Sequence, residues 1–150
     1  MIKFSTTRFG EVEIEKSKII HFEDGLPAFD EEHDFLIVPY EENSPYSFLQ
    51  SVHTPDLAFL MTSPFVFFPT YEFGLNDDQV EKLGLEKEED ILLYVLITIP
   101  GKNIKEMTAN LLAPVVINQK NLQAEQVVLT GTQYTTKHRL FPDQAGKGGK

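Results

Sequence analysis

The side chains best suited to chemistry lie in one acidic run, residues 30–34, where Glu32 and His33 are flanked by further carboxylates. Carboxylate oxygens and a neutral imidazole are ligands that divalent metals accept, so these two residues are candidates for a small metal-dependent hydrolase. Consecutive side chains on a loop or strand point in different directions, however, and seldom converge on one ion. A solvated acidic turn explains the same run without a metal, and both interpretations stay open here.

Other catalytic patterns are missing from the sequence. The four histidines, at positions 21, 33, 53 and 138, have no spacing that would put two ligands on one helical face. There is no Gly-x-Ser-x-Gly motif, and the chain has no cysteine for a thiolate nucleophile, a disulfide or a cysteine-ligated metal. The Gly-Lys segment at residues 146–150 lacks the Ser or Thr of a phosphate-binding loop. We therefore expect no enzymatic activity and no cofactor.

The charge is acidic and unevenly distributed. The net charge is −10, made up of −14 over residues 1–100, with 20 acidic and 6 basic residues, and +4 over residues 101–150, with 3 acidic and 7 basic residues. Such a field repels phosphate backbones, whereas nucleic-acid binding depends on Lys and Arg that neutralise phosphates. We expect no direct binding of nucleic acid, and the charge favours a basic protein partner.

The sequence also indicates a location. The N-terminal residues are polar and charged, unlike a signal peptide. The longest strongly apolar run, residues 91–99, is about half of the ~18 to 20 residues that a membrane-spanning helix needs. We expect a cytoplasmic protein without a membrane contact.

Short runs of strand-forming residues between Gly, Pro, Asp and Asn predict an all-β fold with predominantly antiparallel pairing, as a sandwich or a barrel. Residues 11–15 alternate polar and apolar types with the period of a half-buried strand. Residues 91–99 show no polar alternation, which predicts a central strand covered on both faces, with Leu96 buried near its middle. The other predicted strands are 18–22, 35–38, 47–52, 57–62, 114–118 and 126–129, with a further candidate at 107–112.

One or two short helices are expected beside the strands. Residues 76–83 have a capping Asn or Asp at the start and Gly84 after the end. Residues 30–34 are a candidate for a second short turn. The length favours a single binding domain over residues 1–141, followed by a disordered tail at residues 142–150.

Several segments, in this order and spacing, resemble the flagellar assembly factor W family over about residues 4–140. They are Phe9-Gly10-Glu11, Phe22-Glu23-Asp24-Gly25-Leu26-Pro27-Ala28-Phe29, Phe48-Leu49-Gln50-Ser51-Val52, Leu57-Ala58-Phe59, Pro69-Thr70-Tyr71, Asn110-Leu111-Leu112-Ala113-Pro114-Val115-Val116-Ile117-Asn118 and Gln126-Val127-Val128-Leu129. The resemblance implies a pseudo-barrel and a protein that binds newly made flagellin. It also implies binding to the translational repressor carbon storage regulator A, which relieves repression of flagellin translation.

Five residues of these segments are candidates for partner binding: Gln50, Ser51, Tyr71, Asn110 and Leu111. The alternative is that they only satisfy backbone groups or fill the core. The sequence also leaves open how the repressor would be silenced, by imitation of RNA or by docking elsewhere. Because the acidic residues fall in separated clusters, docking away from the RNA contacts is the favoured hypothesis.

Overall fold

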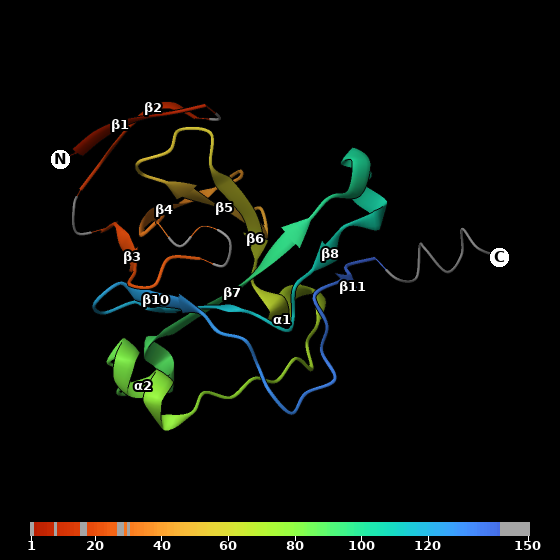
Figure 1. Ribbon diagram of the computed structural model, residues 1–150. Helices are drawn as coiled ribbons and strands as arrows, with labels where there is room; N and C mark the ends of the chain where they lie inside the picture. Colours follow the sequence, from red (N-terminus) through yellow and green to blue (C-terminus); the bar gives the residue numbers. More distant parts are fainter. Residues whose placement is uncertain (1, 8, 16–17, 27–28, 30, 142–150) are drawn as a thin grey trace.

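Strands dominate the computed structural model, which describes residues 2–7, 9–15, 18–26, 29 and 31–141 (Figure 1). The predicted tail at residues 142–150 lies outside the described residues, and the single-domain boundary at residue 141 stays a prediction. The strands are β1 (Ile2–Thr6), β2 (Gly10–Ile14), β3 (Ile20–Phe22), β4 (Asp34–Pro39), β5 (Tyr46–Ser51), β6 (Ala58–Thr62), β7 (Ile91–Thr98), β8 (Thr108–Ala109), β9 (Val115–Asn118), β10 (Gln123–Gln126) and β11 (His138–Arg139). The α-helices are α1 (Pro64–Phe67) and α2 (Asp77–Leu83), and short 3-10 turns cover Glu88–Asp90, Pro100–Lys102 and Ile104–Glu106.

Seven of these strands close into a barrel. The pairing order is β3-β4-β5-β6-β7, and β7 then pairs with β9, β9 with β10, and β10 with β3. All of these pairs are antiparallel except β10 with β3. The predicted all-β, predominantly antiparallel pseudo-barrel with one or two short helices is confirmed.

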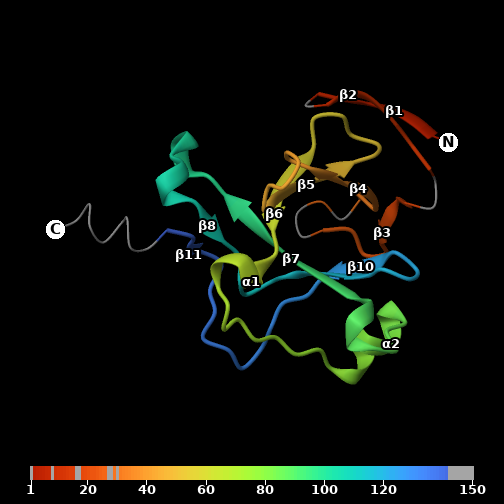
Figure 2. The ribbon, with the colours of Figure 1, turned by 180° about the vertical axis from the view of Figure 1, so that it is seen from behind.

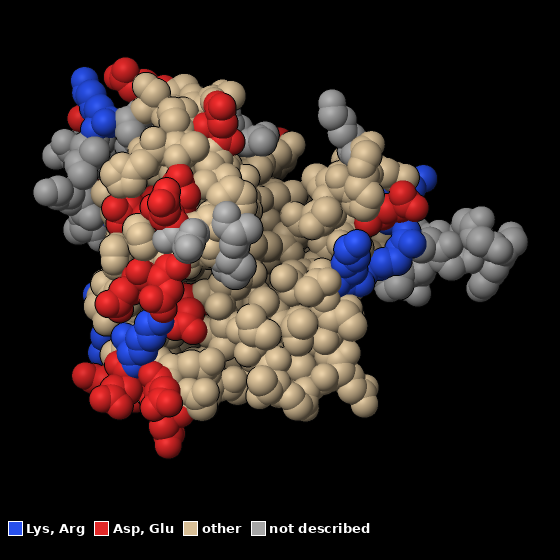
Figure 3. Space-filling model, in the orientation of Figure 1, with Lys and Arg blue, Asp and Glu red and all other residues tan. Residues whose placement is uncertain are grey.

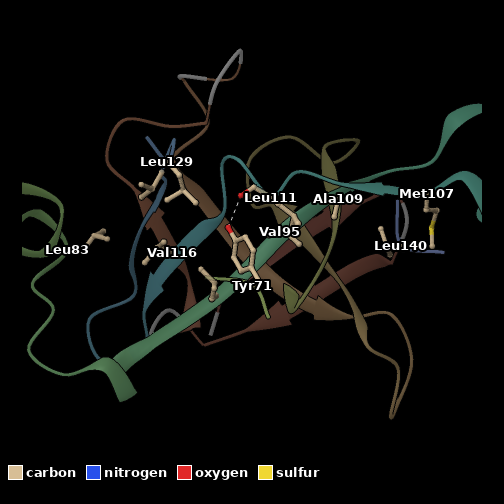
Figure 4. Close-up of a cluster of buried hydrophobic side chains, with 11 residues drawn as sticks. Tyr71, Leu83, Val95, Met107, Ala109, Leu111, Val116, Leu129 and Leu140 are labelled. Carbon is tan, nitrogen blue, oxygen red and sulfur yellow. Dashed lines mark hydrogen bonds between the residues drawn. The ribbon is translucent and has the colours of Figure 1, made fainter. Parts of the chain in front are cut away.

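β7 has apolar side chains on both faces, and each face packs against a separate core. The inner core fills the barrel and includes Phe22, Phe35, Leu49 and Met61, with Leu92, Tyr94 and Leu96 of β7 packed against it. The outer core lies on the other face of the sheet. It contains Tyr71, Leu83, Leu93, Val95, Met107, Ala109, Leu111, Val116, Val127, Leu129 and Leu140, most of which are labelled in Figure 4. The prediction of a central strand covered on both faces is confirmed, although Leu96 is half-buried instead of buried.

α2 begins and ends where the sequence predicts. The Asn76 side chain accepts a hydrogen bond from the Gln79 N–H at 2.8 Å, and the Gln79 side chain accepts one from the Asn76 N–H at 2.9 Å. At the other end Gly84 adopts a φ of 67°, and Asn118 Nδ2 donates to the Leu83 carbonyl oxygen at 2.8 Å. Both caps supply hydrogen-bond partners to backbone groups that have none within the helix. Within the part of the chain that the structure describes, no helix has the length and apolarity needed to cross a bilayer.

The strand predicted at residues 126–129 is shifted in the structure, since β10 covers Gln123–Gln126. The sequence Gln123-Ala124-Glu125-Gln126 is mostly polar and gives no apolar pattern. It forms a strand because β3 and β9 pair with it on its two edges, and such pairing outweighs a weak local preference.

Other differences concern short elements. β1, α1 and β11 were not predicted, because a few residues carry too little periodicity to identify a strand or a single helical turn. The candidate strand at residues 107–112 is reduced to β8, Thr108–Ala109. The turn predicted at residues 30–34 is present in part: the Glu32 N–H donates to the Phe29 carbonyl oxygen at 3.0 Å, Asp34 opens β4, and Asp30 lies outside the described residues.

Met61 and Leu96 are register partners on β6 and β7, but Met61 is fully buried and Leu96 is half-buried. Met61→Ala should therefore lower the free energy of unfolding by ~2 to 5 kcal/mol, the usual cost of emptying a buried site. Leu96→Ala should cost clearly less, because part of its side chain is already exposed to solvent. Urea denaturation of both variants measures the difference, and equal losses would contradict the assignment of Met61 to the barrel interior.

Candidate partner-binding surface

Gln50 lies at the end of β5 and is fully buried. Its Nε2 donates to the carbonyl oxygens of Ser51 and Leu57 at 3.0 and 3.1 Å, and it lies 3.3 Å from that of Pro55. The amide thus satisfies the carbonyl groups of the turn that joins β5 to β6. Gln50 fixes the shape of this turn and does not reach the surface.

Ser51 is also fully buried and connects the same turn to the predicted acidic run. Its Oγ donates to Glu32 Oε1 at 2.6 Å and accepts from the Thr54 N–H at 2.9 Å, and the Thr54 hydroxyl donates to the other Glu32 oxygen. The hydrogen bonds from Ser51 and Thr54 hold the pKa of Glu32 below its ordinary value, against the opposing effect of burial. Glu32 is held as a carboxylate by two hydroxyl groups.

Asp34 is held in a similar way by two histidines. His21 Nδ1 lies 3.0 Å from Asp34 Oδ1, and His53 Nε2 lies 3.1 Å from Asp34 Oδ2. Burial alone would raise the pKa of Asp34, but the hydrogen bonds and charges of the two histidines outweigh it and lower the pKa. His33, in contrast, contacts the Phe22 carbonyl oxygen through Nδ1 at 2.8 Å.

This arrangement gives no support to the hydrolase hypothesis. Glu32 and His33 are engaged with different partners. Among the residues that the structure describes, no group of three or more His, Cys, Asp or Glu side chains is placed to hold a metal ion. Glu32 and Asp34 of the acidic run instead connect the start of β4 to the turn after β5.

The other three predicted site residues lie together in or beside the outer core. Tyr71 is buried, and its hydroxyl donates to the Leu111 carbonyl oxygen at 2.7 Å (Figure 4). Burial and the nearby Tyr134 raise the pKa of Tyr71 well above its ordinary value. Leu111 is buried as well, and Asn110 Oδ1 accepts from the Ala113 N–H at 3.0 Å. The three residues attach the segment before α2 to the chain between β8 and β9.

The five predicted residues therefore form two separate groups, one at the turn after β5 and one in the outer core. Four of them are buried, so their side chains cannot contact a partner directly. They can affect binding only by holding the neighbouring surface segments in place. Partner binding at these segments stays a prediction.

A surface that the sequence did not reveal lies between α1, α2 and the start of β7. It is an apolar groove of about 570 Å³, lined mainly by Phe65, Phe73, Leu75, Val80, Leu85, Ile91 and Leu93, with Glu86, Lys87 and Glu88 at its rim. Phe65 is 45% exposed, and the adjacent Val66 is 55% exposed. The Phe-rich run at residues 64–68 was the available signal, but an apolar run does not tell whether it faces a core or a groove.

A second groove of about 600 Å³ lies on the other side of Phe73 and Gly74. We call it the strand-edge groove. Its walls are residues 72–74, together with Asn76 and Gln79, and residues 127–134, the continuation of β10. Both ribbon views show these two segments below the barrel (Figures 1 and 2), and both line the groove. The Glu72 N–H donates to the Tyr134 hydroxyl at 2.9 Å, which joins the two walls at one end.

Charged side chains are distributed unequally over the face drawn in Figure 3. Acidic groups gather on the side of α2 and the early strands, and basic groups stand out near β8 and β11. Between them, the surface over the two extended segments is largely uncharged. The grooves thus open beside an acidic field that can attract a basic partner.

Comparison with known proteins places these features in a family. The family model described as FliW protein matches residues 3–140. The flagellar assembly factor FliW of Geobacillus kaustophilus is 44% identical over 146 residues, which cover 97% of this chain and 100% of the relative, and that of Heliobacterium modesticaldum is 42% identical over 99% of both. A solved structure, the crystal structure of the flagellar assembly factor FliW, superposes with a TM-score of 0.88 at 44% identity, covering 95% of this chain and 99% of that one.

The pairing of Asp34 with two histidines predicts a specific response to acid. The ordinary pKa of Asp is 3.8 and the folded-state pKa lies below it, so the contribution to stability is present above about pH 4 and is lost as the pH falls through the folded value. Asp34→Asn should lower the melting temperature at pH 7, and the difference from the wild type should shrink below about pH 4. Thermal denaturation of Asp34→Asn and the wild type across this pH range measures the difference, and Glu41→Gln, at an exposed position, is the control. A difference in melting temperature that does not change with pH would contradict the proposed role of the Asp34 carboxylate.

Proposed function

Because the chain belongs to the FliW protein family, we propose that it acts in flagellar assembly as a non-catalytic binding protein in the cytoplasm. Its partners in this proposal are flagellin and carbon storage regulator A. Binding of the repressor allows translation of flagellin, and flagellin that accumulates in the cytoplasm occupies the protein and restores repression. The absence of cysteine from the sequence fits a reducing compartment.

The observation that carries the flagellin half is the apolar groove. In this proposal the protein covers an apolar helical end of monomeric flagellin that would otherwise assemble into filament. An amphipathic helix binds proteins by laying its apolar face into such a groove. Phe65, Phe73 and Leu75 offer an apolar floor, and an aromatic side chain in a groove is the usual anchor of an interface. The groove accordingly fits a helix of the partner better than it fits a polar small molecule.

For the repressor, the distribution of acidic residues supports docking away from its RNA site. Imitation of RNA requires carboxylates in a dense line, to replace successive phosphates. The exposed acids Glu11 and Glu13 of β2 lie at the opposite end of the molecule from Asp77 and Asp78 of α2 (Figure 1). The acidic field then serves mainly to speed the encounter with a basic partner, and the affinity comes from desolvated contacts.

Phe65→Ser should weaken binding of monomeric flagellin by about tenfold or more, since it removes the exposed aromatic anchor of the groove. The matched control is Ile104→Ser, which changes an equally apolar side chain, 63% exposed, outside the groove lining. Gel filtration of the mixtures and calorimetric titration measure complex formation. If the wild type and flagellin elute separately at micromolar concentration, the flagellin half of the proposal is wrong; equal losses in both variants would exclude this groove.

Docking away from the RNA site predicts a plateau in competition experiments. When labelled RNA and repressor are titrated with this protein, extra RNA should not fully restore the RNA complex. Higher salt should lower the association rate with the repressor more than it raises the dissociation rate, because screening weakens long-range attraction first. Complete reversal of inhibition by excess RNA would instead establish imitation of RNA.

A further inference from the structure

The chain after β10 stays paired on one edge and is unpaired on the other. The Val127 N–H donates to the Pro114 carbonyl oxygen at 2.9 Å, and the Leu129 N–H donates to that of Leu112 at 2.8 Å. These bonds continue the register in which Gln126 faces Val115. On the opposite edge, β3 pairs with β10 only at Gln123 and Ala124. Beyond this point the second edge of the extended chain has no neighbouring strand among the described residues.

Successive residues of a strand direct their N–H groups to opposite edges. Since Val127 and Leu129 bond to the chain before β9, the backbone groups of Val128 and the N–H of Thr130 face the other edge. Among the residues described, these groups have no hydrogen-bond partner. Val128 is also 57% exposed, whereas Val127 and Leu129 are buried. Residues 127–130 are thus an extended segment that continues β10, with its unpaired edge toward the strand-edge groove.

The opposite wall has the same character. Residues 73–75 form an extended segment between α1 and α2, and in the described chain their backbone N–H and C=O groups also lack partners. A Cβ added to Gly74 would meet no atom within 4 Å, so this wall borders open space. The groove of about 600 Å³ is therefore bounded on both sides by unpaired main-chain groups.

We propose that the strand-edge groove binds an uncharged, extended peptide segment of a partner protein, which adds as a β-strand to residues 127–130. Strand addition draws its affinity from main-chain hydrogen bonds, and alternate side chains give the selectivity. Among the described residues that line the groove, Glu72 is the one that carries a charge, and Figure 3 shows an uncharged surface there. Neutral residues with β-branched side chains, such as Val and Thr, suit this site best.

Two other occupants fit the groove less well. A helix satisfies its own backbone groups, so it leaves those of both walls unpaired. A second copy of this chain would bring a whole sheet, whose next strand lies about 4.8 Å behind the first. Residues 72–74 occupy the side of the groove where that next strand would have to lie. The groove therefore has room for a single extended chain and not for the edge of a sheet. The site adjoins the apolar groove proposed for flagellin and shares Phe73 and Gly74 with it, but its other wall, residues 127–134, is its own.

The test is a selection of displayed random peptides of roughly twelve residues on the intact protein, a length that forms either a strand or about three helical turns. Val128→Pro and Thr130→Pro each remove one N–H that faces the groove and leave the Val127 and Leu129 bonds in place. Val128→Ala and Thr130→Ala are the matched controls, because they change the side chain and keep the N–H. Melting temperatures identify any variant that fails to fold.

The wild type should enrich uncharged peptides with alternating β-branched residues. Their affinity should fall by about tenfold or more for either proline variant, remain in the alanine controls, and be lost when alternate peptide amides are methylated. Hydrogen exchange of the Val128 and Thr130 amides should slow when a peptide binds. The proposal is overturned if no peptide is enriched, if the enriched peptides have a helical apolar pattern, or if amide methylation leaves binding unchanged.

Discussion

The pairing of β7 with β9 is the interaction on which the rest of the structure depends. Residues Ile91–Tyr94 bond to β9 and close the barrel, while the far end of the same strand pairs with β6 on one edge and β8 on the other. β7 is also apolar on both faces, so it contributes to two cores, and the outer core in turn fixes the segments on either side of α2. Both grooves lie on that outer side, so their shape follows from barrel closure.

The sequence predicted the elements whose local pattern is strong. β7 is a long apolar run, and α2 has a capping Asn76, a reciprocal Gln79 and a terminal Gly84, so both were identified from their own residues. β10 was misplaced, because its polar residues become a strand only through two neighbours from distant parts of the chain. Pattern reasoning therefore worked where the stabilising contacts are local, and failed where pairing partners decide.

The candidate site was less predictable than the fold. Gln50 and Ser51 are polar, which is typical of a surface, yet the carbonyl groups of the following turn and the Glu32 carboxylate draw both of them inside. Sequence pattern alone does not distinguish such a buried polar residue from an exposed one, because the hydrogen-bond acceptors meet it only once the following turn and the Glu32 segment have folded around it. The strand-edge groove is similar, since it joins the segment around Gly74 to residues 127–134, which are far from it in the sequence.

Barrel closure also bears on the order in which the chain can fold. The parallel pair of β3 with β10 joins His21 to Gln123, near opposite ends of the described chain, so the barrel cannot close until most of the polypeptide has been synthesised. Contacts between residues so far apart in sequence slow folding, because a long loop must be ordered before they form. A chain still emerging from the ribosome exposes the edge of β3 and the apolar residues of the barrel interior. The outer core and the strand-edge groove, which include residues 127–134 and Leu140, are therefore complete only when most of the chain is available.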